Sequence, residues 1–149
     1  MYSTTRHPAK SERRGAAVVE VALILPLFLA VVFGIVEFGR ALMVGHLLTT
    51  SARYGSRAAI IDGSTNADVE QNVKSHVASV VGVTEDLVTV AINITPAPSN
   101  PDPAGDLSLT KSNDLCEVVV QVQYSDVSYV AGKFLQGTTL TGKCSMRHE

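Results

Sequence analysis

Glu20 is the ionisable residue whose position in this sequence is most unusual, because it lies at the edge of a long apolar run. An uninterrupted apolar run follows it, residues 21–36. As a helix this run would cover about 24 Å, short of the ~30 Å hydrocarbon core of a membrane. A span that starts at Ala16 reaches roughly 31 Å and places the Glu20 carboxylate about 6 Å inside the membrane boundary. A charge there costs about 2 to 3 kcal/mol or more, so it needs a partner, a proton or a function. The alternative is that helix tilt or bilayer thinning lets Glu20 reach the interface.

The two cysteines, Cys116 and Cys144, are the next candidates for chemistry. The strand patterns given below place each thiol on the same side as apolar neighbours, so both should point into one core. A disulfide between them would close a loop of roughly thirty residues and stabilise the fold by about 3 to 4 kcal/mol. We expect this bridge. Two free thiols are the alternative.

Other reactive side chains lack the spacing of a known site. The histidines have no HExxH or Cys-x-x-Cys partner, and there is no Gly-x-Ser-x-Gly elbow or phosphate loop. Asp102, Asp106 and Asp114 surround a proline-rich loop, but their spacing matches no defined calcium loop. The net charge of −2 gives no basic surface for nucleic acid. We therefore expect no enzyme activity, metal, cofactor, nucleic acid or small-molecule substrate; an enzyme with an unrecognised site is the alternative.

The composition of the first fifteen residues predicts a leader segment that stays in the cytoplasm. Residues 1–15 are polar, basic and rich in Ser, Thr and Pro, which predicts disorder. Their basic side chains precede the apolar run, and the positive-inside rule keeps such a flank in the cytoplasm; they are Arg6, Lys10, Arg13 and Arg14. The chain after the run is then exported. An ordinary secretory signal is disfavoured, because the apolar region is too long and no small-x-small cleavage site cleanly follows it.

The apolar segment predicts one transmembrane helix over residues 16–38. Pro26 should kink or loosen it, because its missing N–H leaves the Ala22 carbonyl without its intrahelical partner. Every fourth residue of one narrow row is small or a proline, and such rows let helices pack closely in membranes. We expect this row to be a packing surface: Ala22, Pro26, Ala30 and Gly34.

A boundary ion pair and an outward continuation of the helix should follow. Glu37 and Arg40 are three residues apart, so they can pair on one helix face at the outer membrane boundary, with little energetic effect. Residues 41–61 can continue the helix. Its polar face would carry His46, Thr50, Arg53 and Arg57, and the face covered by the exported domain would carry Leu47, Tyr54, Ala58 and Ile61.

The exported part predicts an α+β domain with a second helix and a small antiparallel sheet of about three strands. A turn at residues 62–66 precedes a helix over 67–81, with Val69, Val73, Val77 and Val80 at helical spacing. Strict alternation predicts strands at residues 88–95, 116–124 and about 138–147. The proline-rich residues 96–106 form a loop, and residues 125–136 allow no assignment.

Over residues 13 to 61 the sequence resembles the TadE-like pseudopilins of bacterial tight-adherence pili. The resemblance rests on Arg-Arg-Gly followed by Ala-Ala-Val-Val-Glu at 13–20, the long apolar helix with its early proline, Glu-Phe-Gly-Arg at 37–40, and Ala-Arg-Tyr-Gly-Ser-Arg-Ala at 52–58. The ending Met-Arg-His-Glu is also typical of the group. A pilin-like fold is what this resemblance implies.

The resemblance also implies processing and an assembly role. In pilin-like proteins a membrane peptidase cuts after a glycine, here between Gly15 and Ala16, and a glutamate stands fifth in the mature chain, here Glu20. Its partner would be a newly freed N-terminal amine, which offsets the burial cost of both charges. Ala16 departs from the Phe common in major pilins, and the large exported domain is unlike the short major subunit of this system. Both departures favour a minor or assembly role.

The expected protein is therefore a minor pseudopilin for biogenesis of an adhesive tight-adherence pilus. It would have a leader at 1–15, a transmembrane helix at 16–38 and a periplasmic domain at 39–149, in the bacterial inner membrane or at the pilus. Its partners would be the membrane, the prepilin peptidase, other pilins or pseudopilins and the assembly platform. The alternative is a single-pass anchored periplasmic binding or scaffold module that is not cleaved at Gly15.

Overall fold

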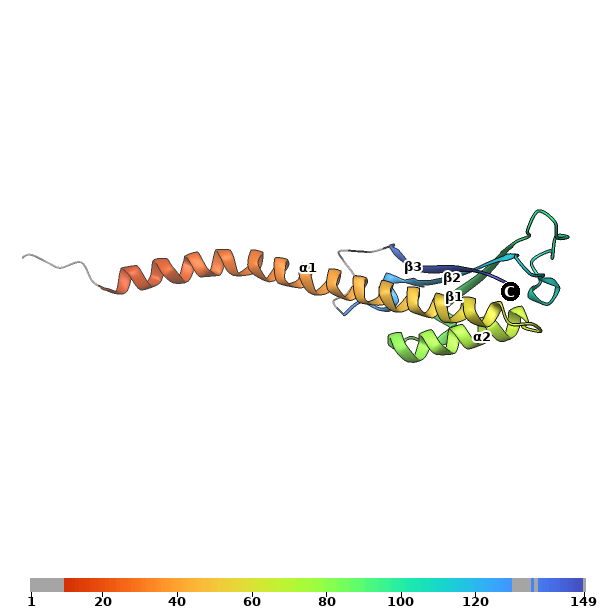
Figure 1. Cartoon of the computed structure of the whole chain (residues 1–149). Helices are drawn as coiled ribbons and strands as arrows, with labels where there is room; N and C mark the ends of the chain where they lie inside the picture. Colours follow the sequence, from red (N-terminus) through yellow and green to blue (C-terminus); the bar gives the residue numbers. More distant parts are fainter. Residues whose placement is uncertain (1–9, 130–134, 136, 149) are drawn as a thin grey trace, which may run out of the picture. The chain divides into compact units, whose positions relative to one another are not determined.

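The computed structural model describes residues 10–129, 135 and 137–148 (Figure 1). The chain divides into two units, Met1–Val36 and Glu37–Glu149. In the first unit the described residues are helical throughout and belong to α1, Lys10–Ala59, which continues through Pro26. Because α1 begins at Lys10, the last residues of the expected leader are helical, and the disorder expected there is wrong at residues 10–15. Residues 1–9 lie outside the described part.

The second unit joins the end of α1 to a second helix and a three-stranded sheet, which confirms the expected α+β class. α2 is Asn66–Val77, and the strands are β1 (Val88–Thr95), β2 (Leu115–Gln123) and β3 (Thr139–Arg147). Both strand pairs are antiparallel, in the order β1-β2-β3. Short 3-10 turns lie at Glu85–Leu87, Leu107–Leu109 and Tyr124–Asp126.

α2 begins and ends with recognisable local signals. The Thr65 hydroxyl accepts a hydrogen bond from the backbone N–H of Asp68, which satisfies a donor of the first turn. The helix then widens into a π-helical turn, Ala78–Gly82. Val69, Val73 and Val77 are buried as the spacing predicts, but Val81 takes the next buried position and Val80 is 43% exposed.

The core lies between the two helices and one face of the sheet (Figure 1). α1 lies against β2 and β3, and α2 packs on β1. Alternate residues of β2 are fully covered, namely Cys116, Val118, Val120 and Val122. α1 contributes Val44, Leu48, Ala52 and Ala59.

This buried face of α1 differs from the expected one. Tyr54 is 49% exposed and Ile61 is 63% exposed, while Leu47 and Ala58 are half-buried. From residue 51 to residue 59 every buried position of α1 carries a small side chain or none, because the backbone of α1 comes close to its neighbours there. The expected polar face is confirmed, since His46, Thr50, Arg53 and Arg57 are exposed.

Two glycines permit this close approach. A Cβ on Gly55 would lie 2.6 Å from Cγ2 of Val73 on α2 and 3.1 Å from Cγ1 of Val118 on β2. A Cβ on Gly142 of β3 would overlap the backbone of Leu48 and Thr49 on α1. Each contact therefore requires a residue without a side chain.

Candidate functional site

The apolar half of α1 has the length and composition of a membrane span. A candidate span covers Gly15–Ala59, and its most apolar 18-residue window has a mean hydropathy of 2.7 with none of its residues buried. Apolar side chains are exposed on all sides of the helix; Leu23 is 79% exposed and Leu27 is 70% exposed. Such a surface is stable in lipid or against other apolar helices. This one helix indicates single-pass membrane anchoring.

The residues expected to carry processing and assembly lie at the start of this segment. Gly15, Ala16 and Glu20 are helical and exposed. A Cβ on Gly15 would meet nothing within 4 Å. Among the side chains that the structure describes, none forms a hydrogen bond or ion pair with Glu20.

The small-residue row is exposed along most of its length. Ala22, Pro26 and Ala30 are exposed, and Gly34 is half-buried. A Cβ on Gly34 would meet nothing within 4 Å. The packing role of this row stays a prediction.

Glu37, which was expected in an ion pair at a membrane boundary, is buried. Its side chain is 0% exposed, and a Glu37 carboxylate oxygen accepts a short hydrogen bond from the hydroxyl of Tyr124. The same hydroxyl lies 3.0 Å from the backbone carbonyl oxygen of Glu37. Burying a carboxylate without such donors would cost several kcal/mol, so the tyrosine is a structural requirement of this site.

Arg40 connects α1 to two other segments of the second unit. Its Nε donates to the carbonyl oxygen of Val127 at 3.1 Å, and its Nη2 donates to that of Val81 at 3.1 Å. The guanidinium carbon also lies 4.6 Å from the ring centroid of Tyr129. The predicted ion pair between Glu37 and Arg40 stays a prediction, but each residue has a partner that the sequence did not reveal.

Tyr124 is the partner of Glu37 that sequence reasoning missed. It stands at the end of the strand expected over residues 116–124, and the structure places it in the 3-10 turn that follows β2. Burial raises the pKa of Tyr124 to about 12, and the hydrogen bond to Glu37 acts in the same direction. The hydroxyl therefore keeps its proton and acts as a donor. The signal in the sequence that could have revealed this contact is Glu37 itself. A carboxylate at the end of an apolar run needs a hydrogen-bond donor from elsewhere in the chain.

The expected disulfide between Cys116 and Cys144 is wrong, and both cysteines are free. They do share one face of the sheet, but the register pairs Cys116 with Met146 and Cys144 with Val118. Diagonal neighbours of this kind stand about 7 to 8 Å apart. A disulfide needs Cα atoms within roughly 7 Å and converging Cβ vectors. Burial also raises the pKa of the Cys116 thiol, which keeps it protonated and unreactive.

The aspartates around the proline-rich loop hold backbone in place. The carboxylate of Asp114 is buried and accepts hydrogen bonds from Ala97 N (2.8 Å), Lys111 N (2.8 Å) and Asn100 Nδ2 (2.7 Å). Asp102 and Asp106 each accept from a backbone N–H two residues further on. The described residues contain no cluster of metal-binding side chains.

Comparison with known proteins finds a family match for the N-terminal part of the chain. No curated protein and no solved structure matches the chain. Residues 15–57 match the family model of TadE-like proteins. This family is associated with the tight-adherence pilus and is structural, not known as enzymatic. The segment that begins at Gly15 and includes Glu20, Glu37 and Arg40 is thus similar to TadE-like proteins, as the resemblance predicted.

Proposed function

We propose that this protein is a minor pseudopilin that supports biogenesis of a tight-adherence pilus and thereby adhesion. The observation that carries the proposal is the TadE-like match over residues 15–57. The exposed apolar surface of the membrane segment supports it, because such a helix can insert in the membrane and later pack against other pilin-like helices.

Processing is the first step of the proposed function. A prepilin peptidase would cut between Gly15 and Ala16. The family match begins at Gly15, which is consistent with a boundary there. The cut removes the basic leader and creates a new N-terminal amine four residues before Glu20.

Glu20 is the proposed assembly residue. A carboxylate about 6 Å inside the membrane boundary is costly unless it is paired. The new amine of its own or a neighbouring subunit would be the positive partner. In support, the Glu20 side chain is exposed on the helix surface.

The proposed location follows from charge. The basic leader stays in the cytoplasm, the helix crosses the bacterial inner membrane, and the unit after Glu37 lies in the periplasm. Other pilins or pseudopilins and the assembly platform would then meet the protein from within the membrane and from the periplasm.

The deciding experiment is the mass of the mature N-terminus in cells with and without the prepilin peptidase. We expect a chain that begins at Ala16 only when the peptidase is present, and Gly15→Val should keep the full-length form. A wild-type chain that retains its leader would instead favour the uncleaved binding or scaffold module.

Glu20→Ala separates processing from assembly. We expect normal cleavage and membrane insertion, because removing a charge from the span makes insertion easier. Pilus formation should fall, measured by counting pili under the electron microscope. Normal piliation in this variant would defeat the proposed role of Glu20.

A further inference from the structure

β1 and β3 are the two edges of the three-stranded sheet, and they differ in how the edge is protected. Each strand pairs with β2 alone, so alternate backbone groups of β1 point away from the sheet, and no described backbone group outside β2 pairs with them. Charged side chains and prolines commonly block such edges. β3 carries Lys143 and Arg147, whereas residues 88–95 include neither a charge nor a proline. β1 is therefore the edge that is open to a further strand.

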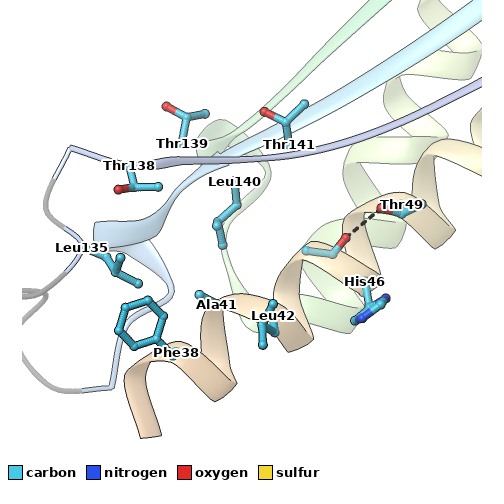
Figure 2. A pocket seen from close by; sticks show the side chains of 11 residues that line it. Phe38, Ala41, Leu42, His46, Thr49, Leu135, Thr138, Thr139, Leu140 and Thr141 are labelled. Atoms are coloured by element: carbon cyan, nitrogen blue, oxygen red, sulfur yellow. Dashed lines mark hydrogen bonds between the residues drawn. The ribbon is translucent and has the colours of Figure 1, made fainter. Parts of the chain in front are cut away.

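The side chains of β1 and β3 alternate in the same way. Val90 and Ile92 of β1 face the helices and are half-buried, while their partners on β2 are fully buried. On β3, Leu140 points toward α1, and Thr139 and Thr141 point away from it (Figure 2). A β3 strand added beside β1 would therefore extend both faces of the sheet without placing polar side chains against apolar ones.

Glu117 and Lys143 give the two edges opposite charges. Glu117 lies on the outer face of β2, and its carboxylate accepts a hydrogen bond from Asn93 Nδ2 on β1 at 3.3 Å. The acidic side chain thus leans over β1 toward the open edge. Lys143 lies on the outer face of β3, at the other edge. With the side chains that the structure describes, neither residue forms an ion pair. Each charge is therefore available to a partner at its own edge.

The direction of the strands decides how two anchored copies can meet. β2 passes Gly55 of α1 at Val118 and reaches Glu37 at Tyr124, so β2 runs opposite to α1. β1 and β3 are antiparallel to β2 and run in the direction of α1. Copies anchored in one membrane insert α1 in the same direction, so β1 and β3 of neighbouring copies meet as parallel strands. Two β1 strands with the same face inward would be antiparallel and would require opposite directions of α1.

We propose that copies of this protein associate edge to edge, with β1 of one copy pairing in parallel with β3 of the next. In one register Lys143 of the next copy lies beside Asn93, where its ammonium group reaches the Glu117 carboxylate, and Thr141 lies beside Ala91. Backbone hydrogen bonds supply the affinity, and the ion pair selects the register. The proposal rests on membrane anchoring and not on peptidase processing or a role in the pilus.

The test uses two differently tagged full-length chains that are produced together in one bacterial membrane. One chain carries Ala91→Cys and the other carries Thr141→Cys. Paired strands lie about 4.8 Å apart, within the range that a disulfide can join. After oxidation with copper phenanthroline, we expect a dimer that contains both tags and is lost on reduction. Val119→Cys is the matched control for Ala91→Cys, because it lies opposite Ala91 on the middle strand, one strand further from the edge.

Charge reversal then tests the ion pair between copies. Lys143→Glu in the chain with Thr141→Cys should lower the dimer yield about threefold, the scale of an exposed ion pair. Glu117→Lys in the chain with Ala91→Cys should restore the yield, because the two reversed charges then lie on different copies. Lys111→Glu makes the same change of charge outside the strands and should have no effect.

Three results would overturn the proposal while leaving membrane anchoring and the proposed function intact. The first is the absence of a mixed dimer, or an equal yield with Val119→Cys. The second is a dimer formed by Ala91→Cys chains alone, which would show that β1 pairs with itself. The third is a loss of yield in Lys143→Glu that Glu117→Lys does not restore, which would show that Lys143 acts within its own chain.

Discussion

Residues 15–36 and 37–59 of α1 form one continuous helix, yet they differ in what surrounds their side chains. The first stretch is apolar on all sides and exposed. The second is amphipathic, and its covered face is made mostly of small residues such as Ala52, Gly55 and Ser56. Uniform hydrophobicity suits lipid, where no one direction is preferred. Small residues on one face instead let a helix backbone come close to a sheet. The change from one pattern to the other occurs at Glu37.

Gly142→Val should have the largest effect, because it disrupts the packing of residues 37–59 of α1 on the sheet. A Cβ there would overlap the backbone of Leu48 and Thr49, and backbone cannot move aside as a side chain can. We expect the free energy of unfolding of the second unit to fall by about 3 kcal/mol or more. Denaturant unfolding of the detergent-solubilised chain measures it.

Gly39→Val is the control for the Gly142 variant, because its Cβ meets nothing within 4 Å. It should change the stability by less than about 1 kcal/mol. Equal effects of the two substitutions would show that α1 does not pack on β3 as described.

Tyr124→Phe tests the contact at Glu37, where the uniformly apolar stretch of α1 ends and the amphipathic stretch begins. It removes the donor that satisfies the buried Glu37 carboxylate, and we expect a loss of about 2 kcal/mol. Glu37→Gln in the same background should recover part of this loss, because the neutral amide is less costly to bury. A double-mutant cycle measures the coupling, and additive effects would argue against the contact.

Asp114 gives the second unit a pH-dependent contribution to its stability. Hydrogen bonds from the backbone N–H groups of Ala97 and Lys111 hold the pKa of this carboxyl below its ordinary value of 3.8. Its stabilising effect is therefore complete above pH 3.8 and is lost as the pH falls from there through the lower folded pKa. Thermal unfolding between pH 7 and pH 3 should show this loss in the wild type and a smaller one in Asp114→Asn. Parallel curves would contradict it.

Substitution of a cysteine should have the smallest effect on the free energy of unfolding. Two thiols per chain should react with a thiol reagent under denaturing, non-reducing conditions. Cys144→Ser should lower the free energy of unfolding by about 1 kcal/mol or less, because only modest packing is lost. A disulfide would instead contribute about 3 to 4 kcal/mol, so a larger loss or a mobility shift on reduction would contradict the free thiols.

Sequence reasoning predicted the elements well, because each depends on local periodicity. The second helix, all three strands and the turn at residues 62–66 lie within a few residues of their expected places. It failed where a property depends on two distant segments. The faces of Cys116 and Cys144 followed from alternation, but their separation depends on the β2–β3 register. The covered face of α1 was assigned by large side chains such as Leu47 and Tyr54, whereas close packing selects small ones.

The contact between Glu37 and Tyr124 has a consequence for the order of biosynthesis. The two residues are 87 positions apart, so Glu37 leaves the ribosome well before its partner is made. At about 5 to 20 residues per second, several seconds pass in between. During that interval the apolar part of the helix can insert in the membrane while the Glu37 carboxylate is still hydrated. The contact between Glu37 and Tyr124 then forms only after β2 has been synthesised and folded, which makes it a marker of a completed second unit.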